Sequence, residues 1–168
     1  MIPKTYIERN IKILSKNFQS SQKPLMTLLY AKLVIIEIGG WVELSMDDII
    51  NRAGKKLKED SNIVHLEKEI IQRNYGFSYE RNFRPMLMKA IGLTRLEKLE
   101  KSLDLSKHQK MVAALKNLKT ARDKVAHTYI KDPALRIVDA PSVSQRHFND
   151  IYAGLKDLEE KMKRINLI

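Results

Sequence analysis

Residues 106–131 read SKHQKMVAALKNLKTARDKVAHTYIK, and this stretch decides the fold class. Its apolar positions recur at intervals of three or four residues, as the 3.6-residue turn of an α-helix requires. The stretch therefore predicts a long amphipathic helix, which Asp132 and Pro133 should terminate because proline is disfavoured inside helices. The inward stripe of this helix consists of Met111, Ala114, Leu115, Leu118, Ala121 and Val125.

Helical periodicity extends over most of the remaining chain. Six glycines and five prolines in 168 residues leave little room for a turn-rich β fold. We therefore expect an all-α helical bundle of about five to seven helices, forming a single domain over residues 1–168. The other expected helices cover residues 4–18, 25–53, 60–73 and 142–166, with shorter helical pieces between 78 and 105.

The composition favours contact with polyanions. Thirty-one Lys and Arg residues oppose twenty Asp and Glu residues, which gives a formal net charge of +11. Such an excess attracts nucleic acids, because each phosphate that is neutralised releases condensed counterions. A surplus of charge that serves only solubility is the alternative. The absence of cysteine excludes disulfides, thiolate zinc sites and a cysteine nucleophile, and it is consistent with a reducing cytosol.

No membrane segment is expected from the sequence. The most apolar stretch, residues 33–44, is too short to cross a bilayer and contains Glu37 and Glu43. The first apolar residues are interrupted by charged ones, so no secretory signal is visible. These patterns predict a soluble, cytoplasmic protein.

One residue breaks the pattern of the helix at 106–131. Arg122 falls between Leu115 and Leu118 on a helical wheel, inside the apolar stripe. A charged residue on a buried face needs a partner or a function. His127 follows five residues later and diverges from Arg122 by about 140° on an ideal helix. A cleft between two helices, or a loosened turn near Thr128, would let both side chains reach one substrate.

Residues 121–129, ARDKVAHTY, resemble the signature of the HEPN superfamily of nucleases. That signature is an arginine, a polar residue directly after it, and a histidine near the end of a long helix. Arg122, Asp123 and His127 occupy these positions. Tyr129 extends the match to the Arg-x4-His-x-Tyr form of HEPN toxins that are paired with nucleotidyltransferase antitoxins. The motif also lies on the expected penultimate long helix, before an amphipathic last helix. The resemblance covers residues 25–165, except for residues 55–105, which we interpret as a family-specific insertion.

The resemblance implies a metal-independent endoribonuclease, either a toxin or a phage-defence effector. In this reaction the 2′-hydroxyl of RNA attacks the adjacent phosphate and leaves a 2′,3′-cyclic phosphate. The resemblance also implies a homodimer with a composite active site, and it allows an antitoxin partner. We expect no cofactor and no metal. The residue types suit the chemistry, because histidine titrates near neutral pH and a guanidinium can hold two phosphate oxygens.

Several residues are assigned supporting roles. Asp123 is expected to orient the arginine or the histidine. Nearby positive charge should favour the neutral form of His127. Tyr129 and Glu37 are supporting candidates, and in related toxins the tyrosine can receive nucleotides from a partner enzyme. The expected contacts to the RNA backbone come from Lys119, Lys124 and Lys131.

Structural interpretations compete with these roles. Arg122 can form an ion pair inside the bundle, for which Glu37 is the natural partner. His127 can be a helix-end histidine that the helix dipole favours. Tyr129 can belong to the core, because on a continuous helix it lies in line with Leu118 and Val125.

The remaining polar and aromatic clusters point mainly to structure. His65, His108 and His147 are scattered and do not show metal-site spacing. The pair Asp47 and Asp48 predicts a solvated helix face. Aromatic residues interleaved with arginines can stack single-stranded bases, but core packing is the favoured interpretation. This cluster consists of Tyr75, Phe77, Tyr79 and Phe83 among Arg73, Arg81 and Arg84.

Two alternatives to an enzyme remain open from the sequence. One is a non-catalytic HEPN module that binds nucleic acid or a partner protein. The other is a helical interaction protein in which the motif is accidental. Affinity for RNA at low salt distinguishes the first from the second.

Overall fold

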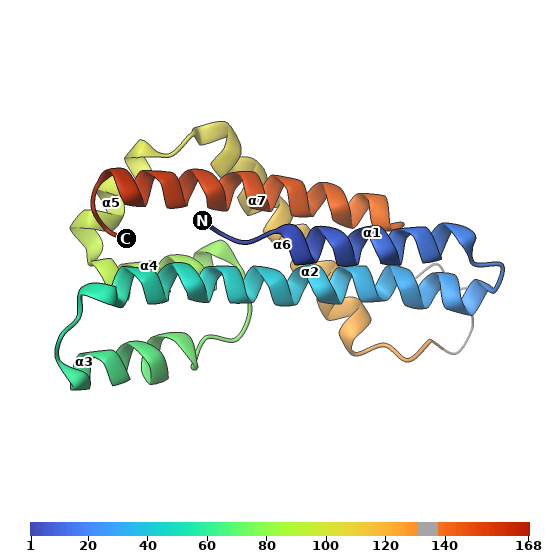
Figure 1. The fold of residues 1–168 in the computed structure, drawn as a ribbon, viewed down its shortest axis with the longest axis horizontal. Helices are drawn as coiled ribbons and strands as arrows, with labels where there is room; N and C mark the ends of the chain where they lie inside the picture. The colour runs from blue at the N-terminus through green and yellow to red at the C-terminus, as the bar shows by residue number, and fades with distance from the viewer. Residues whose placement is uncertain (131–137) are drawn as a thin grey trace.

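The computed structural model describes residues 1–130 and 138–168, and all regular structure within them is helical (Figure 1). The expectation of an all-α bundle is therefore confirmed. The α-helices are α1 (Thr5–Ser20), α2 (Pro24–Ala53), α3 (Asp60–His65), α4 (Arg84–Ile91), α5 (Leu93–Ser102), α6 (Leu105–Ala126) and α7 (Pro141–Arg164). A short 3-10 turn follows α2 (Gly54–Lys56), and two π-helical segments cover Leu66–Ile71 and Tyr79–Phe83.

The four long helices form the body of the molecule. Helix α1 packs along α2, α6 packs along α7, and α2 contacts both α6 and α7 (Figure 1). Gly154 of α7 lets α6 come close, because a Cβ atom there would overlap the Met111 side chain. The bundle is therefore held by direct helix contact along most of its length, with one continuous apolar core inside.

Residues 55–105 pack into this same core. Their buried side chains include Phe77, Phe83 and Leu87, which join the apolar cluster formed by α2, α6 and α7. Helix α4 packs against α2, and α5 packs against α7. The one helix expected over residues 60–73 is instead α3 followed by the π-helical segment Leu66–Ile71.

Helix α6 ends earlier than the sequence indicated. It stops at Ala126 rather than at residue 131, and His127 is the first residue beyond it. The Thr128 hydroxyl donates to the Lys124 carbonyl, which supplies that carbonyl with a donor outside the helical ladder. Lys32 of α2 donates to the Thr128 carbonyl at 3.0 Å. These two contacts hold the backbone in place between the end of the helix and Tyr129.

Helix α2 extends well beyond the apolar stretch 33–44 on which the prediction of no membrane segment was based. The segment Pro24–Lys56 is long and apolar enough to cross a bilayer by length and composition, a test that a core helix of a soluble protein also passes. Length therefore does not exclude that the whole of α2 could cross a membrane. Val34, Ile38 and Val42 of α2 are fully buried against the rest of the protein.

A buried carboxylate joins the two ends of the chain. Glu159 of α7 is 1% exposed and accepts hydrogen bonds from Arg52 Nη1 at 2.5 Å and from the Ile2 backbone N–H at 3.0 Å. Its Oε1 also lies 2.8 Å from the Met1 amino group and 3.0 Å from Lys163 Nζ. Burial alone would raise the pKa of Glu159, but these four donors outweigh burial and lower the pKa to about 2.

Candidate active site around Arg122

Arg122 lies on the inner side of α6 and remains within reach of solvent. Its side chain is 31% exposed, and its Nη1 donates to Glu43 Oε1 of α2 at 2.8 Å. The guanidinium carbon lies 5.3 Å from the centre of the Phe77 ring, a cation–π contact. The aliphatic stem crosses α2 at Gly39, where an added Cβ atom would lie 3.3 Å from Arg122 Cδ. The absence of a side chain at Gly39 thus leaves room for the aliphatic part of Arg122 between the two helices.

The ion pair expected for Arg122 exists, but the predicted partner was wrong. Glu37 is exposed and accepts a hydrogen bond from Asn10 Nδ2 at 3.0 Å. Glu37 and Glu43 are six residues apart on α2, so they differ by about 120° around the helix axis. Glu37 therefore faces α1, whereas Glu43 faces α6.

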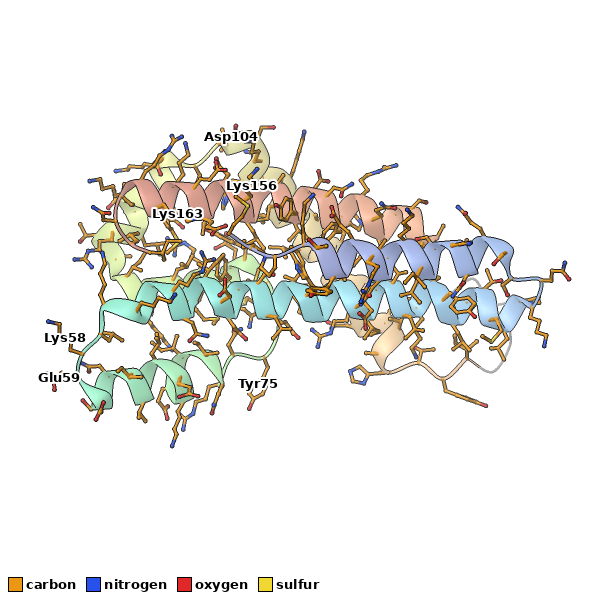
Figure 2. All side chains as sticks on the ribbon, viewed as in Figure 1. Lys58, Glu59, Tyr75, Asp104, Lys156 and Lys163 are labelled. Atoms are coloured by element: carbon orange, nitrogen blue, oxygen red, sulfur yellow. The ribbon has the colours of Figure 1, made fainter. Side chains whose placement is uncertain are left out.

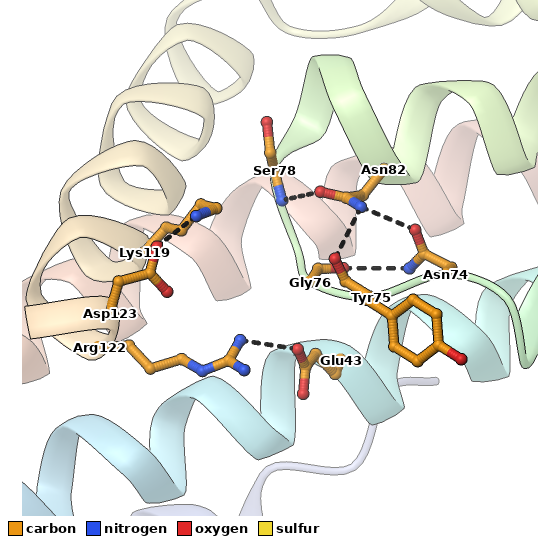
Figure 3. A network of polar contacts seen from close by, with 9 residues as sticks. All are labelled: Glu43, Asn74, Tyr75, Gly76, Ser78, Asn82, Lys119, Arg122 and Asp123. Carbon is orange, nitrogen blue, oxygen red and sulfur yellow. Dashed lines mark hydrogen bonds and ion pairs between the residues drawn. The ribbon is translucent and has the colours of Figure 1, made fainter. Parts of the chain in front are cut away.

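A pocket of about 330 Å³ opens beside the Arg122–Glu43 pair. It lies between α2, α6 and the loop before the second π-helical segment (Figure 3). Glu43 takes up one of the five N–H donors of the guanidinium, and no other hydrogen bond from Arg122 is found within the described residues. Arg122 is thus positioned by Glu43 and keeps donors for a ligand. The pocket is lined by Glu43, Asp47, Asn74, Tyr75, Gly76, Lys119, Arg122 and Asp123.

The solvated helix face that the sequence predicted is found for Asp48, whose side chain is 46% exposed, but not for Asp47. Asp47 is half-buried in the pocket wall, where burial, and secondly the charge of Glu43, raises its pKa to about 6. Asp48 Oδ2 lies 2.8 Å from Arg52 Nη2, so this carboxylate has an ion-pair partner on its own helix. Of these two residues, only Asp47 lines the Arg122 pocket.

We expect Asp47→Asn to raise the free energy of unfolding at pH 8 by about 1 kcal/mol, a figure reduced for solvent screening of a half-exposed group. The folded-state pKa of about 6 exceeds the ordinary value of 3.8, so ionisation of Asp47 destabilises the fold. The gain should shrink as the pH falls through about 6 and vanish below about 4. Urea denaturation at both extremes measures it.

Glu97→Gln is the matched control for this prediction. It removes the exposed ion pair with Lys101 within α5 and should lower stability by no more than about 0.5 kcal/mol. An Asp47→Asn variant that is less stable than the parent at pH 8 would contradict the assignment, because it would mean that the ionised carboxylate stabilises the fold.

His127 is not among the residues that line the Arg122 pocket. It is exposed and follows the last residue of α6, so the pocket of a single chain brings together Arg122 and Asp123 without the histidine. Tyr129 is 81% exposed beyond the end of the helix, and the expectation that it could belong to the core was wrong.

The predicted supporting residues are dispersed. Asp123 pairs with Lys119 one turn earlier on α6, so the orienting role expected toward Arg122 or His127 is not seen within the described residues. Lys119 lines the Arg122 pocket. Lys124 instead lines a separate pocket of about 430 Å³ together with His147. Lys131 lies outside the described residues.

Most of the remaining aromatic cluster is buried, as the core-packing interpretation predicted. No group of three or more potential metal ligands occurs in the part of the chain that the structure describes. His108 packs edge-on against the Tyr79 ring at 4.7 Å between ring centres. Phe77, Tyr79 and Phe83 are buried, whereas Tyr75 is 86% exposed.

Glu43 and Tyr75 line the Arg122 pocket but were not predicted from the sequence. A signal for Glu43 existed, because Gly39, Glu43 and Asp47 recur every four residues and so share one side of α2. No comparable signal marked Tyr75, whose exposure depends on how the loop folds.

No protein-family model, no curated protein and no solved structure matches this chain.

Proposed function

We propose that this protein is a metal-independent endoribonuclease of the HEPN type and acts as a homodimer. The observation that carries the proposal is the state of Arg122, which is held between α2 and α6 with donors open to a pocket. A guanidinium can bind a phosphate and stabilise the charge of a transition state. Here Arg122 and Lys119 must do so beside the carboxylates of Glu43, Asp47 and Asp123, which line the same pocket. The exposed imidazole of His127, directly after the last residue of α6, supplies a group that can act as general base and general acid.

The separation of His127 from the Arg122 pocket supports a site shared between two chains. Arg122 lines its pocket from within α6, whereas His127 follows the last residue of that helix and does not line the pocket. Two motif helices related by a two-fold axis would place Arg122 of one chain near His127 of the other. The small residues Ala121 and Ala126 would allow close approach of these helices. Exposed leucines on α2 offer apolar surface for such an interface: Leu25, Leu33 and Leu44.

The proposed reaction requires only these two groups and the RNA. Neutral His127 takes the proton from the 2′-hydroxyl, and the 2′-oxygen forms a bond to phosphorus as the bond to the 5′-oxygen breaks. The protonated histidine returns a proton to the departing 5′-oxygen. Arg122 holds the non-bridging phosphate oxygens while negative charge accumulates on them. The products are a 2′,3′-cyclic phosphate and a 5′-hydroxyl.

Product chemistry is the direct test of this proposal. Incubation of single-stranded RNA with the protein and a chelator should give fragments with 5′-hydroxyl ends, which polynucleotide kinase can label. Their 3′ ends should resist phosphatase until acid opens the cyclic phosphate. A mobility shift without cleavage would overturn the proposal in favour of a non-catalytic module, and no binding at low salt would favour a protein-interaction role.

A non-catalytic RNA-binding module is the second candidate. It is favoured by the ion pair between Arg122 and Glu43, which fully accounts for a charged residue at the helix crossing without catalysis. A cytoplasmic role as a toxin or phage-defence effector, an antitoxin partner and modification of Tyr129 belong to the first candidate and stand or fall with it.

A further inference from the structure

Tyr75 is exposed at the boundary between two pockets. Its ring is 86% exposed, although it belongs to a run of aromatic residues of which Phe77, Tyr79 and Phe83 are buried. Tyr75 lines the Arg122 pocket, and it also lines a neighbouring pocket of about 640 Å³. A large apolar ring in this position has no packing role that would explain it.

The loop that carries Tyr75 is braced by its own side chains. The Asn82 amide nitrogen donates to Asn74 Oδ1 at 2.9 Å and to the Tyr75 carbonyl at 3.2 Å (Figure 3). Asn82 Oδ1 accepts from the Ser78 N–H at 3.1 Å, and Asn74 Nδ2 donates to the Gly76 carbonyl at 3.0 Å. Gly76 has a φ of +112°, which favours glycine. The backbone under the Tyr75 ring is therefore fixed before any ligand binds, which lowers the entropy cost of binding.

The second pocket is basic and shares Asn74 and Tyr75 with the Arg122 pocket. Its basic lining residues are Arg73, Arg81 and Lys89, with His65 at its edge. Glu69 is the one acidic residue of the lining, and it already pairs with Arg73 at 2.5 Å. Positive charge of this kind can follow a phosphodiester backbone. The Tyr75 side chain projects into solvent from the braced loop (Figure 2).

We propose that Tyr75 is a stacking platform for an unpaired base, placed between the Arg122 phosphate site and the basic pocket of Arg73, Arg81 and Lys89. This inference rests on the proposed function and names its substrate as single-stranded RNA. A duplex cannot offer a base to Tyr75, because its bases are already stacked on one another. Two π-helical segments flank the loop, at Leu66–Ile71 and Tyr79–Phe83, and such segments are frequent at functional sites.

Binding to a non-cleavable strand tests this inference separately from catalysis. The probe is a 2′-O-methyl oligonucleotide of about ten residues with a terminal fluorophore, measured by anisotropy at low salt. Tyr75→Ala should weaken binding about tenfold, and Tyr75→Phe should bind like the parent, because stacking needs the ring and not the hydroxyl. Tyr6→Ala removes another exposed tyrosine, 72% exposed on α1, and should leave binding unchanged. A blunt duplex of the same sequence should bind equally to the parent and to Tyr75→Ala.

The outcomes separate this inference from the proposed function. Equal binding of the single strand by Tyr75→Ala and the parent would overturn the platform even if RNA is cleaved. A tenfold loss in a protein that cuts no RNA would support the platform and overturn the ribonuclease. A similar loss for Tyr6→Ala would show that exposed rings act non-specifically, which also overturns the platform.

Discussion

Arg122→Ala and His127→Ala should each reduce RNA cleavage by about 100-fold to 10,000-fold while the protein keeps its helical fold. The first removes the group that holds the phosphate, and the second removes the group that moves the proton. Initial rates on a labelled RNA measure both. Arg122 also packs on Gly39 and Phe77, so Arg122→Lys is the gentler variant: it keeps the charge and the stem but cannot grip two oxygens at once.

A matched control lies elsewhere on the surface. Arg164→Ala removes an exposed arginine from the end of α7 and should leave cleavage unchanged. If the Arg122 and His127 variants cut RNA at the parental rate while folded, the assignment of both catalytic residues is wrong.

Mixing the two inactive variants tests whether the site is shared. A dimer of one Arg122→Ala chain and one His127→Ala chain would contain one intact composite site. Random exchange should therefore restore about one quarter of the parental activity. If mixing restores nothing although each variant alone is inactive, both groups act within one chain and the composite site is wrong.

Glu159→Gln should lower the free energy of unfolding by about 3 kcal/mol at pH 7, because it leaves Arg52 and the other donors around a buried site without their charge partner. The folded-state pKa of about 2 lies below the ordinary value of 4.5, so ionised Glu159 stabilises the fold. That contribution is complete above pH about 4.5 and disappears as the pH falls toward about 2. The two proteins should thus converge in stability at low pH, which urea denaturation at several pH values measures.

Glu160→Gln is the neighbouring control. Glu160 is exposed and lies 3.9 Å from Lys156 Nζ, so its loss should change stability by less than about 0.5 kcal/mol. If Glu159→Gln is as stable as the parent at pH 7, the prediction is wrong: the free-energy cost of burying the carboxylate would then equal the stabilisation from its four partners.

The sequence predicted the helical architecture because apolar periodicity is a local property. The stripe from Met111 to Val125 is buried as expected except for Ala121, which is partly buried, and Arg122 does interrupt it. The end of α6 was misjudged because the contact that holds Thr128 comes from Lys32, nearly one hundred positions earlier in the chain. Periodicity within 106–131 carries no information about that contact.

The site was predictable only in part, for a related reason. Arg122 was marked by a conflict between its charge and its place on one helix, which sequence alone reveals. Its partner depended on how α2 is rotated against α6, and a choice between Glu37 and Glu43 needs that rotation. Whether His127 meets Arg122 depends on a second chain and stays a prediction.

The segment 55–105 has a consequence for anyone who would shorten this protein to its four long helices. It carries Phe77, which lies under the guanidinium of Arg122, and Tyr75, which forms one wall of the adjoining hollow. Deleting this segment would leave the sequence of α6 intact but would remove the Phe77 ring that packs against the Arg122 guanidinium. The surroundings of Arg122 therefore depend on a segment that a shortened protein would lack.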